Sequence, residues 1–267
     1  MLNDYLPLIT LSSPGQIAFQ LGNLTIRWYG IFIAVAFLTS YFLGERIAKR
    51  NNLNVDVFND LIFYILISGV LFARLYFVLL SWDYFKDHIS EIPKIWLGGQ
   101  SIHGGILGTI IAVLIYSKVK KISFYSYIDL FSVMAPLGQA IGRWGNFFNN
   151  EAFGKPVVEI GKPYLYRLYI PLEYRPENYI NYKYFHPTFL YESIIDFIIF
   201  IFLYRNYSKW KTKAGKTFWV YLLFYSIIRF FLEFLRVDSL CAFGNIPFPQ
   251  IISVIISIVA IVFLIKK

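Results

Sequence analysis

The segment "LIFYILISGVLFARLYFVLL" (residues 61–80) decides the class of fold, because it is almost continuously apolar. A helix needs about 20 such residues to cross the hydrocarbon core of a bilayer. Residues 61–80 reach that length, and Arg74 is the only charged side chain among them. The segment therefore predicts a transmembrane helix with one buried cation.

The composition of the whole chain agrees with a membrane protein. Of its 267 residues, 57% are hydrophobic and only 15% are charged, whereas soluble domains average about 45–50% and about 25%. The net charge of +9 requires no nucleic-acid partner, because the basic residues stand in short clusters between apolar runs. Residues 1–24 contain no Lys or Arg, so we expect no cleavable signal peptide.

Further apolar segments of similar length follow along the chain, and together they predict an all-α polytopic membrane protein. We expect about seven transmembrane helices in a single transmembrane domain over residues 1–267. The predicted spans are 26–44, 61–80, 101–117, 122–142, 188–204, 217–237 and 249–265.

The loops between these spans predict an orientation. Basic clusters occupy the loops "ERIAKRNN" (45–52), "SKVKK" (117–121) and "RNYSKWKTKAGK" (205–216), and two lysines end the chain. All four lie on one side of a seven-span protein, and short basic loops remain cytoplasmic. We therefore expect the N-terminus outside, the C-terminus in the cytoplasm, and residues 143–187 as a small extracytoplasmic head with strands around 164–174.

Ionisable residues inside the predicted spans collect in the outer half of the membrane. Such residues are costly in hydrocarbon and usually mark a functional site. Their clustering predicts a polar cavity that opens to the outer leaflet, whereas a transport site would more often lie near the midplane. The outer group comprises Arg74, Arg143, Glu192, Arg229 and Glu233, while Asp129 and Asp196 lie deeper.

The sixth predicted span carries a polar stripe. Tyr225, Arg229, Glu233 and Arg236 are separated by four, four and three residues, so they share one face of a helix. An ion pair that only holds the bundle together would explain Arg229 and Glu233. A phenol and a second cation on the same face favour a binding site.

The segment "GRWGNFFNNEAFG" (142–154) surrounds one arginine with amides. Arg143, Asn146 and Asn150 share a helical face if the helix continues, and they line a loop if it breaks at Gly145. In both cases a guanidinium among amide groups suits an anionic, oxygen-rich ligand such as a phosphate.

The segment "WLGGQSIHGGILG" (96–108) places His103 between glycine pairs. Gly104 and Gly108 are four residues apart and predict a face where two helices pack closely. His103 is then either a functional imidazole or a side chain that hydrogen-bonds a neighbour. A metal site of His103, Glu151 and His186 is conceivable, but no spacing typical of zinc enzymes occurs, and we expect no metal and no cofactor.

Taken together, these motifs resemble those of the bacterial prolipoprotein diacylglyceryl transferases. The resemblance extends along the whole chain, and the principal polar positions match the family pattern. It is carried by "RWYG" (27–30), "ARLYFVLL" (73–80), "WLGGQSIHGGILG" (96–108), "GRWGNFFNNEAFG" (142–154), "HPTFLYES" (186–193) and "YSIIRFFLEFLR" (225–236).

The resemblance implies a reaction at the outer leaflet of the bacterial cytoplasmic (inner) membrane. The diacylglyceryl group of phosphatidylglycerol is transferred to the lipobox cysteine of a preprolipoprotein, which forms a thioether and releases glycerol phosphate. This is the first step of lipoprotein maturation. The implied partners are phosphatidylglycerol and the preprolipoprotein signal peptide, and we expect a monomer. The reacting cysteine belongs to the substrate, so we do not expect Cys241 to take part.

The resemblance also implies roles for particular residues. Arg143 and Arg229 are expected to hold the lipid phosphate. The resemblance marks His103 and Tyr225 as functional positions without deciding which of them moves the proton. Our hypothesis is that His103 takes the proton of the acceptor thiol, with Tyr225 as the alternative base or as a positioning group. The remaining residues expected to shape the substrate-binding site are Tyr29, Asn146, Glu151, Gly154 and Glu233.

Other classes of function explain the sequence less well. An anion transporter would use the same arginines but form no covalent product. An intramembrane protease or a different lipid-modifying enzyme would require a metal site or a nucleophile constellation that the sequence does not display. A membrane scaffold without catalytic activity would not need so many polar residues in its spans.

Overall fold

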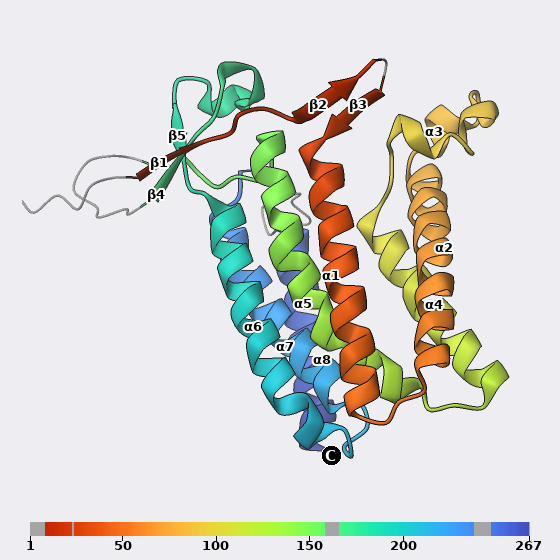
Figure 1. Cartoon of the computed structure of the whole chain (residues 1–267). Coiled ribbons are helices and arrows are strands. Elements are labelled where there is room, and N and C mark those ends of the chain that lie inside the picture. The colour runs from red at the N-terminus through yellow and green to blue at the C-terminus, as the bar shows by residue number, and fades with distance from the viewer. Residues whose placement is uncertain (1–8, 23, 158–165, 238–246, 267) are drawn as a thin grey trace, which may run out of the picture. The chain divides into compact units, whose positions relative to one another are not determined.

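The computed structural model is mostly helical and describes residues 9–22, 24–157, 166–237 and 247–266 (Figure 1). Its contacts divide the chain into two compact units. The first unit consists of residues 1–42 and 132–267, and the second of residues 43–131. Each unit is described by itself below.

Seven long helices occur in the described part of the chain, close to the seven predicted segments. Three of them, α1, α2 and α8, are long and apolar enough to cross a membrane by length and composition alone. The seven are α1 (Trp28–Arg50), α2 (Val55–Leu80), α4 (Ile102–Lys120), α5 (Phe124–Asn149), α6 (Thr188–Trp210), α7 (Lys216–Glu233) and α8 (Phe248–Ile265).

The second unit is built on the packing of α2 against α4. Asn54 caps the start of α2, where its side chain accepts hydrogen bonds from the backbone N–H groups of Asp56 and Val57. A Cβ added at Gly104 would lie 2.3 Å from the carbonyl oxygen of Phe72, and one at Gly108 would lie 2.5 Å from that of Ser68. Only glycine allows this approach of two backbones, and the small residues form the close-packing face that the sequence predicted.

A loop joins α2 to α4 and contains α3 (Trp82–Phe85) and two short 3₁₀ turns, Ile89–Glu91 and Ile95–Leu97. It returns to α2 about two turns before that helix ends, since the backbone N–H of Ser101 donates to the carbonyl of Ala73 at 3.0 Å. This contact fixes where α4 begins.

The first unit combines helices with two small sheets at one end of its helices (Figure 1). Strand β1 (Ile9–Ser12) pairs in parallel with β4 (Tyr166–Tyr169), which pairs antiparallel with β5 (Tyr184–Phe185). A separate hairpin joins β2 (Ile17–Leu21) and β3 (Leu24–Arg27). The strand expected around residues 164–174 is present as β4, whereas the other four strands correct the expectation of an all-α protein.

An aromatic core fixes the start of α6 within this unit. Phe153, Leu168, Phe185 and Phe189 are buried together, and burying a side chain of this size contributes about 1.5–3 kcal/mol. The rings of Phe147 on α5 and Phe189 on α6 lie 4.9 Å apart. These contacts hold the end of α5 beside the start of α6, where the polar residues of the next section lie.

Candidate active site

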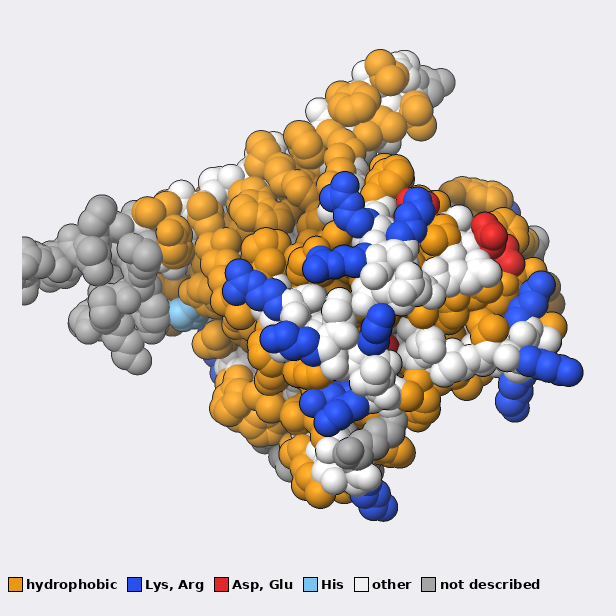
Figure 2. Space-filling view, turned by 60° about the horizontal axis from the view of Figure 1, so that its bottom comes forward, with side chains coloured by type: hydrophobic (Ala, Val, Ile, Leu, Met, Phe, Trp, Pro, Cys, Tyr) orange, Lys and Arg blue, Asp and Glu red, His pale blue; other side chains and the backbone are white. Residues whose placement is uncertain are grey.

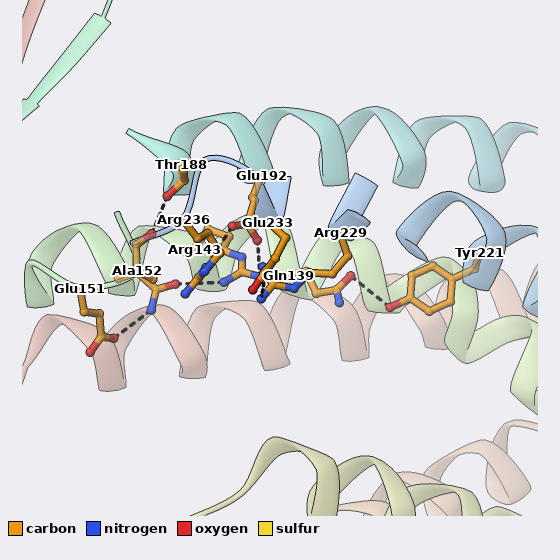
Figure 3. A network of polar contacts seen from close by, with 11 residues as sticks. Gln139, Arg143, Glu151, Ala152, Thr188, Glu192, Tyr221, Arg229, Glu233 and Arg236 are labelled. Carbon is orange, nitrogen blue, oxygen red and sulfur yellow. Dashed lines mark hydrogen bonds and ion pairs between the residues drawn. The ribbon is translucent and has the colours of Figure 1, made fainter. Parts of the chain in front are cut away.

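Glu192 is the centre of a buried ion-pair cluster in the first unit (Figure 3). Its carboxylate forms an ion pair with the guanidinium of Arg143, which projects from α5. The guanidinium of Arg236, just beyond α7, lies 3.5 Å from the other carboxylate oxygen of Glu192. The Glu192 side chain is 5% exposed, and that of Arg143 is 23% exposed. One buried carboxylate therefore serves two cations, and Arg143 is the more accessible of them.

Arg229 and Glu233 form a second ion pair at the end of α7. Their nitrogen and oxygen atoms lie 2.8 Å apart, and the Glu233 side chain is 1% exposed. The second terminal nitrogen of Arg229, Nη1, is buried and has no hydrogen-bond partner among the described residues. A buried N–H group without a partner is costly, so Nη1 offers a donor to a bound ligand.

The end of α5 forms a polar rim next to Arg143. Nη1 of Arg143 lies 3.5 Å from Oδ1 of Asn146, and Nδ2 of Asn146 donates to Glu151 at 2.8 Å. Asn149 donates to the same Glu151 oxygen at 3.2 Å. Arg143, Asn146 and Glu151 are thus connected by side-chain contacts.

The helix does not break at Gly145, because α5 continues to Asn149. Residues 143–149 of the segment expected to form the head are therefore the last two turns of a helix. The chain then turns through Asn150 and Ala152, whose φ angles of 53° and 56° are left-handed. This turn leads the backbone away from the axis of α5 and towards Gly154.

Tyr29 packs on Gly145 where α1 and α5 pass each other within the first unit. A Cβ added at Gly145 would lie 2.6 Å from the Tyr29 ring. Tyr29 is 37% exposed. Because Gly145 has no side chain, the Tyr29 ring can lie against α5 at a position two residues after Arg143.

Gly154 lies at a closely packed position next to the start of α6. A Cβ there would lie 2.8 Å from Cβ of His186 and 2.9 Å from Cγ2 of Thr188. Its N–H donates to the carbonyl of His186 at 2.9 Å, and Gly154 forms an antiparallel β-bridge with Arg236. Gly154 therefore connects the segment that follows α5 to the segment that contains Arg236.

His186 lies next to this bridge. Burial lowers the pKa of its imidazole below the ordinary value.

The polar cluster continues deeper along α7. Tyr225 is half-buried one turn before Arg229, and its ring lies 6.0 Å from that of Tyr221. Tyr221 donates its hydroxyl to Gln139 on α5 at 3.1 Å. Asp196, one turn beyond Glu192 on α6, is also buried. Tyr225 therefore stands between the arginines and a deeper polar pair.

His103 belongs to the second unit, where it lies in the first turn of α4 and is exposed. Its ring lies 6.3 Å from that of Tyr76 on α2. The described residues of the chain contain no group of three or more His, Cys, Asp or Glu side chains arranged to hold a metal ion. Cys241 lies outside the described residues.

The structure brings together most of the predicted site residues and adds others. Arg143, Asn146, Glu151, Arg229, Glu233 and Tyr225 all belong to the first unit. The sequence analysis counted Glu192 among the outer charges and Arg236 in the polar stripe, but it gave neither a role in the site and did not predict that Glu192 contacts Arg143 and Arg236. The signal was available, because an acidic residue inside a predicted span requires a cationic partner.

Comparisons with known proteins identify the family. The family model described as prolipoprotein diacylglyceryl transferase matches residues 16–266. The phosphatidylglycerol–prolipoprotein diacylglyceryl transferase of Staphylococcus epidermidis is 42% identical over 97% of this chain and 91% of its own length. The enzymes of the same name from Nostoc sp. and Staphylococcus aureus are 44% and 45% identical, over 93% and 92% of this chain and 88% and 86% of their own lengths. The chain therefore belongs to the prolipoprotein diacylglyceryl transferase family, as the resemblance of its motifs predicted.

Proposed function

We propose that this chain transfers the diacylglyceryl group of phosphatidylglycerol to the lipobox cysteine of a preprolipoprotein, the first step of lipoprotein maturation. The observation that carries the proposal is the cluster of Arg143, Arg229 and Arg236, which share two glutamates inside a bundle of apolar helices. Counting these five side chains alone, three cations face two anions. A phosphate monoanion or dianion is the ligand that such a cluster accommodates best.

The proposed reaction exchanges one bond at the lipid glycerol for another. The thiolate of the acceptor cysteine attacks the carbon of the diacylglyceryl group that is bonded to the phosphate oxygen. A carbon–sulfur bond forms as that carbon–oxygen bond breaks. Glycerol phosphate leaves with the electron pair of that bond. Arg143 and Arg229 bind the phosphate and stabilise the negative charge that grows on it, while a base of the enzyme takes the thiol proton.

The proposed base is His103, with Tyr225 as the alternative. The thiolate is the reactive form of cysteine, and the ordinary pKa of a thiol is about 8.5, so a base is needed at neutral pH. Tyr29, Asn146, Glu151 and Gly154 shape the site around the phosphate. Glu233 orients Arg229 through their ion pair.

We further propose that the seven long helices span the bacterial cytoplasmic (inner) membrane, with the N-terminus outside and the C-terminus in the cytoplasm. In Figure 2 the molecule is turned so that the bottom of Figure 1 comes forward. The surface that faces the reader carries many Lys and Arg side chains and few Asp or Glu side chains. Short basic segments remain cytoplasmic. Arg143, Glu192 and Glu233 lie near those ends of α5, α6 and α7 that are remote from the basic segments. Their position supports an active site that faces the outer leaflet. In this arrangement the extracytoplasmic head comprises residues 150–187, after the end of α5. We also propose that the enzyme acts as a monomer.

The function is tested by incubating the purified protein with phosphatidylglycerol and a peptide that contains a lipobox cysteine. We expect the peptide to gain the mass of one diacylglyceryl group and glycerol phosphate to appear in equal amount. A peptide with serine in place of the cysteine should gain nothing, because its hydroxyl is not deprotonated at neutral pH. Anion flux across vesicles without any change in peptide mass would support a transporter instead.

The choice of base is tested by comparing His103→Gln with Tyr225→Phe across pH. If His103 is the base, His103→Gln should lower the turnover at pH 7 by about 10²–10⁴-fold. Its rate should rise by about 16-fold, and so recover only in part, as the pH rises towards about 8.5, because the thiolate fraction of a thiol with its ordinary pKa grows from about 3% to about 50%. Tyr225→Phe should lose less and keep the pH profile of the parent protein. Near-normal turnover of His103→Gln at pH 7 would remove His103 as the base.

A further inference from the structure

Arg74 is a buried cation whose hydrogen bonds all go to backbone carbonyls of one loop. Arg74 is 6% exposed. It lies on α2 and is the only charged residue in the segment 61–80. Nε donates to the carbonyl of Ile92 at 2.8 Å and Nη2 to that of Glu91 at 2.7 Å. Nη1 donates to the carbonyls of Gly98 and Gly99 at 2.6 and 3.0 Å. The guanidinium has no carboxylate partner among the described residues.

The four carbonyls belong to two separate parts of the loop between α2 and α4. Glu91 and Ile92 lie at the end of the first 3₁₀ turn, whereas Gly98 and Gly99 lie directly before α4. Arg74 also rests on the ring of Phe85 in α3, with 5.1 Å between the guanidinium carbon and the ring centre. One side chain thus holds the outgoing and returning halves of the loop together.

The returning half has no room to shift towards α2. Gly99 has a φ of +73°, and a Cβ there would lie 2.4 Å from the Phe77 ring and 2.9 Å from Nη1 of Arg74. Ser101 is held by its N–H bond to the carbonyl of Ala73. Gly104 packs against the backbone of α2. His103 therefore stands between two points at which α4 is fixed to α2, beside Tyr76.

We propose that Arg74 is a positioning residue for His103. Its guanidinium fixes the segment 98–101, that segment fixes the first turn of α4, and the first turn sets the place of the imidazole. The inference rests on the proposed function of His103 for its catalytic consequence. The positioning itself rests only on contacts within the second unit.

The shape of arginine is what this role requires. A planar guanidinium directs donors to both halves of the loop at once, whereas a lysine ammonium is a compact charge on a flexible stem. Arg74→Lys therefore keeps the buried charge but loses the simultaneous contacts. A displacement of about 1 Å in a reacting group can cost about 10²-fold in rate, so the first turn of α4 need not unfold for turnover to fall.

The test measures the His103 ring directly. The chain contains three histidines, so isotope labelling of histidine and single replacements assign each NMR signal. We expect Arg74→Lys to shift or broaden the His103 signal and leave that of His186, in the first unit, unchanged. Turnover should fall about 10–100-fold, while the KM for phosphatidylglycerol stays within about threefold, because the proposed phosphate ligands are on other helices.

Lys86→Gln is the matched control, since Lys86 is an exposed cation of the same loop, 3.1 Å from Asp83. It should leave the His103 signal and the turnover unchanged. Gly99→Ala is the second variant if Arg74→Lys fails to fold, because it keeps Arg74 and displaces the same segment. An unmoved His103 signal in the folded variant overturns the proposal, whatever its turnover. A moved signal supports it, and if His103→Gln is nonetheless fully active, the proposed base fails while the positioning stands.

Discussion

Replacing Glu192 with alanine is expected to destabilise the protein by about 3–5 kcal/mol, the range for removing one partner of a buried ion pair. Two guanidiniums, those of Arg143 and Arg236, form ion pairs with this one carboxylate. The Glu192 side chain is 5% exposed, so its removal leaves two cations without their carboxylate in a site with little solvent. The measurement is the free energy of unfolding in detergent micelles, followed by the signal of the tryptophans during denaturation.

The control is Glu45→Ala, which also removes a carboxylate from an ion pair. Glu45 and Lys49 lie 2.7 Å apart, but their side chains are 26% and 60% exposed, and exposed pairs contribute about 0–1 kcal/mol. Equal losses of stability in the two variants would contradict the role of Glu192 as the centre of the cluster. Glu192→Gln should fall between them, because its amide keeps an oxygen that accepts from Arg143 but carries no charge.

The helices of this fold could be predicted because a local property of the sequence determines them. Apolar runs of spanning length predicted all seven long helices, and the basic loops marked where they end. The end of α5 was less predictable, since Gly145 suggested a break in isolation. Two side chains of α1 support the last two turns of α5, since Tyr29 packs on Gly145 and Trp28 stacks on Phe148. Such tertiary contacts are not visible in a local pattern.

The sheet could not be predicted in the same way, because its pairing is distant in sequence. Residues 9–12 pair with residues 166–169, and nothing in either short segment specifies the other. The site shows the same limit. The spacing of Arg229 and Glu233 on one helix indicated their contact, but the contact of Glu192 with Arg143 and Arg236 joins three separate segments. The sequence alone indicated that each of these charged side chains needs a partner of opposite charge. It did not indicate which residue that partner is.

Arg143→Lys is expected to lower lipid transfer by about 10²–10³-fold, the range for removing one donor to a developing oxyanion. The guanidinium of Arg143 binds Glu192 with one terminal nitrogen, and the other lies 3.5 Å from Asn146. Donors therefore remain on its accessible side for a phosphate. Lysine keeps the positive charge opposite Glu192, so we expect stability to change little. It cannot hold Glu192 and contact a phosphate in the same planar geometry, so turnover with phosphatidylglycerol is the measurement.

The matched control is Arg46→Lys, which makes the same chemical change at an exposed position on α1. That variant should keep full turnover, since Arg46 lies in the predicted cytoplasmic half of its helix. The fall in Arg143→Lys should appear in turnover more strongly than in lipid binding, because the phosphate carries more charge when it leaves than when it binds. If Arg143→Lys binds phosphatidylglycerol less tightly but transfers it at the parental rate at saturation, Arg143 serves only to hold the ground-state lipid. In that case the stabilisation of the leaving phosphate passes to Arg229, whose buried Nη1 has no hydrogen-bond partner among the described residues.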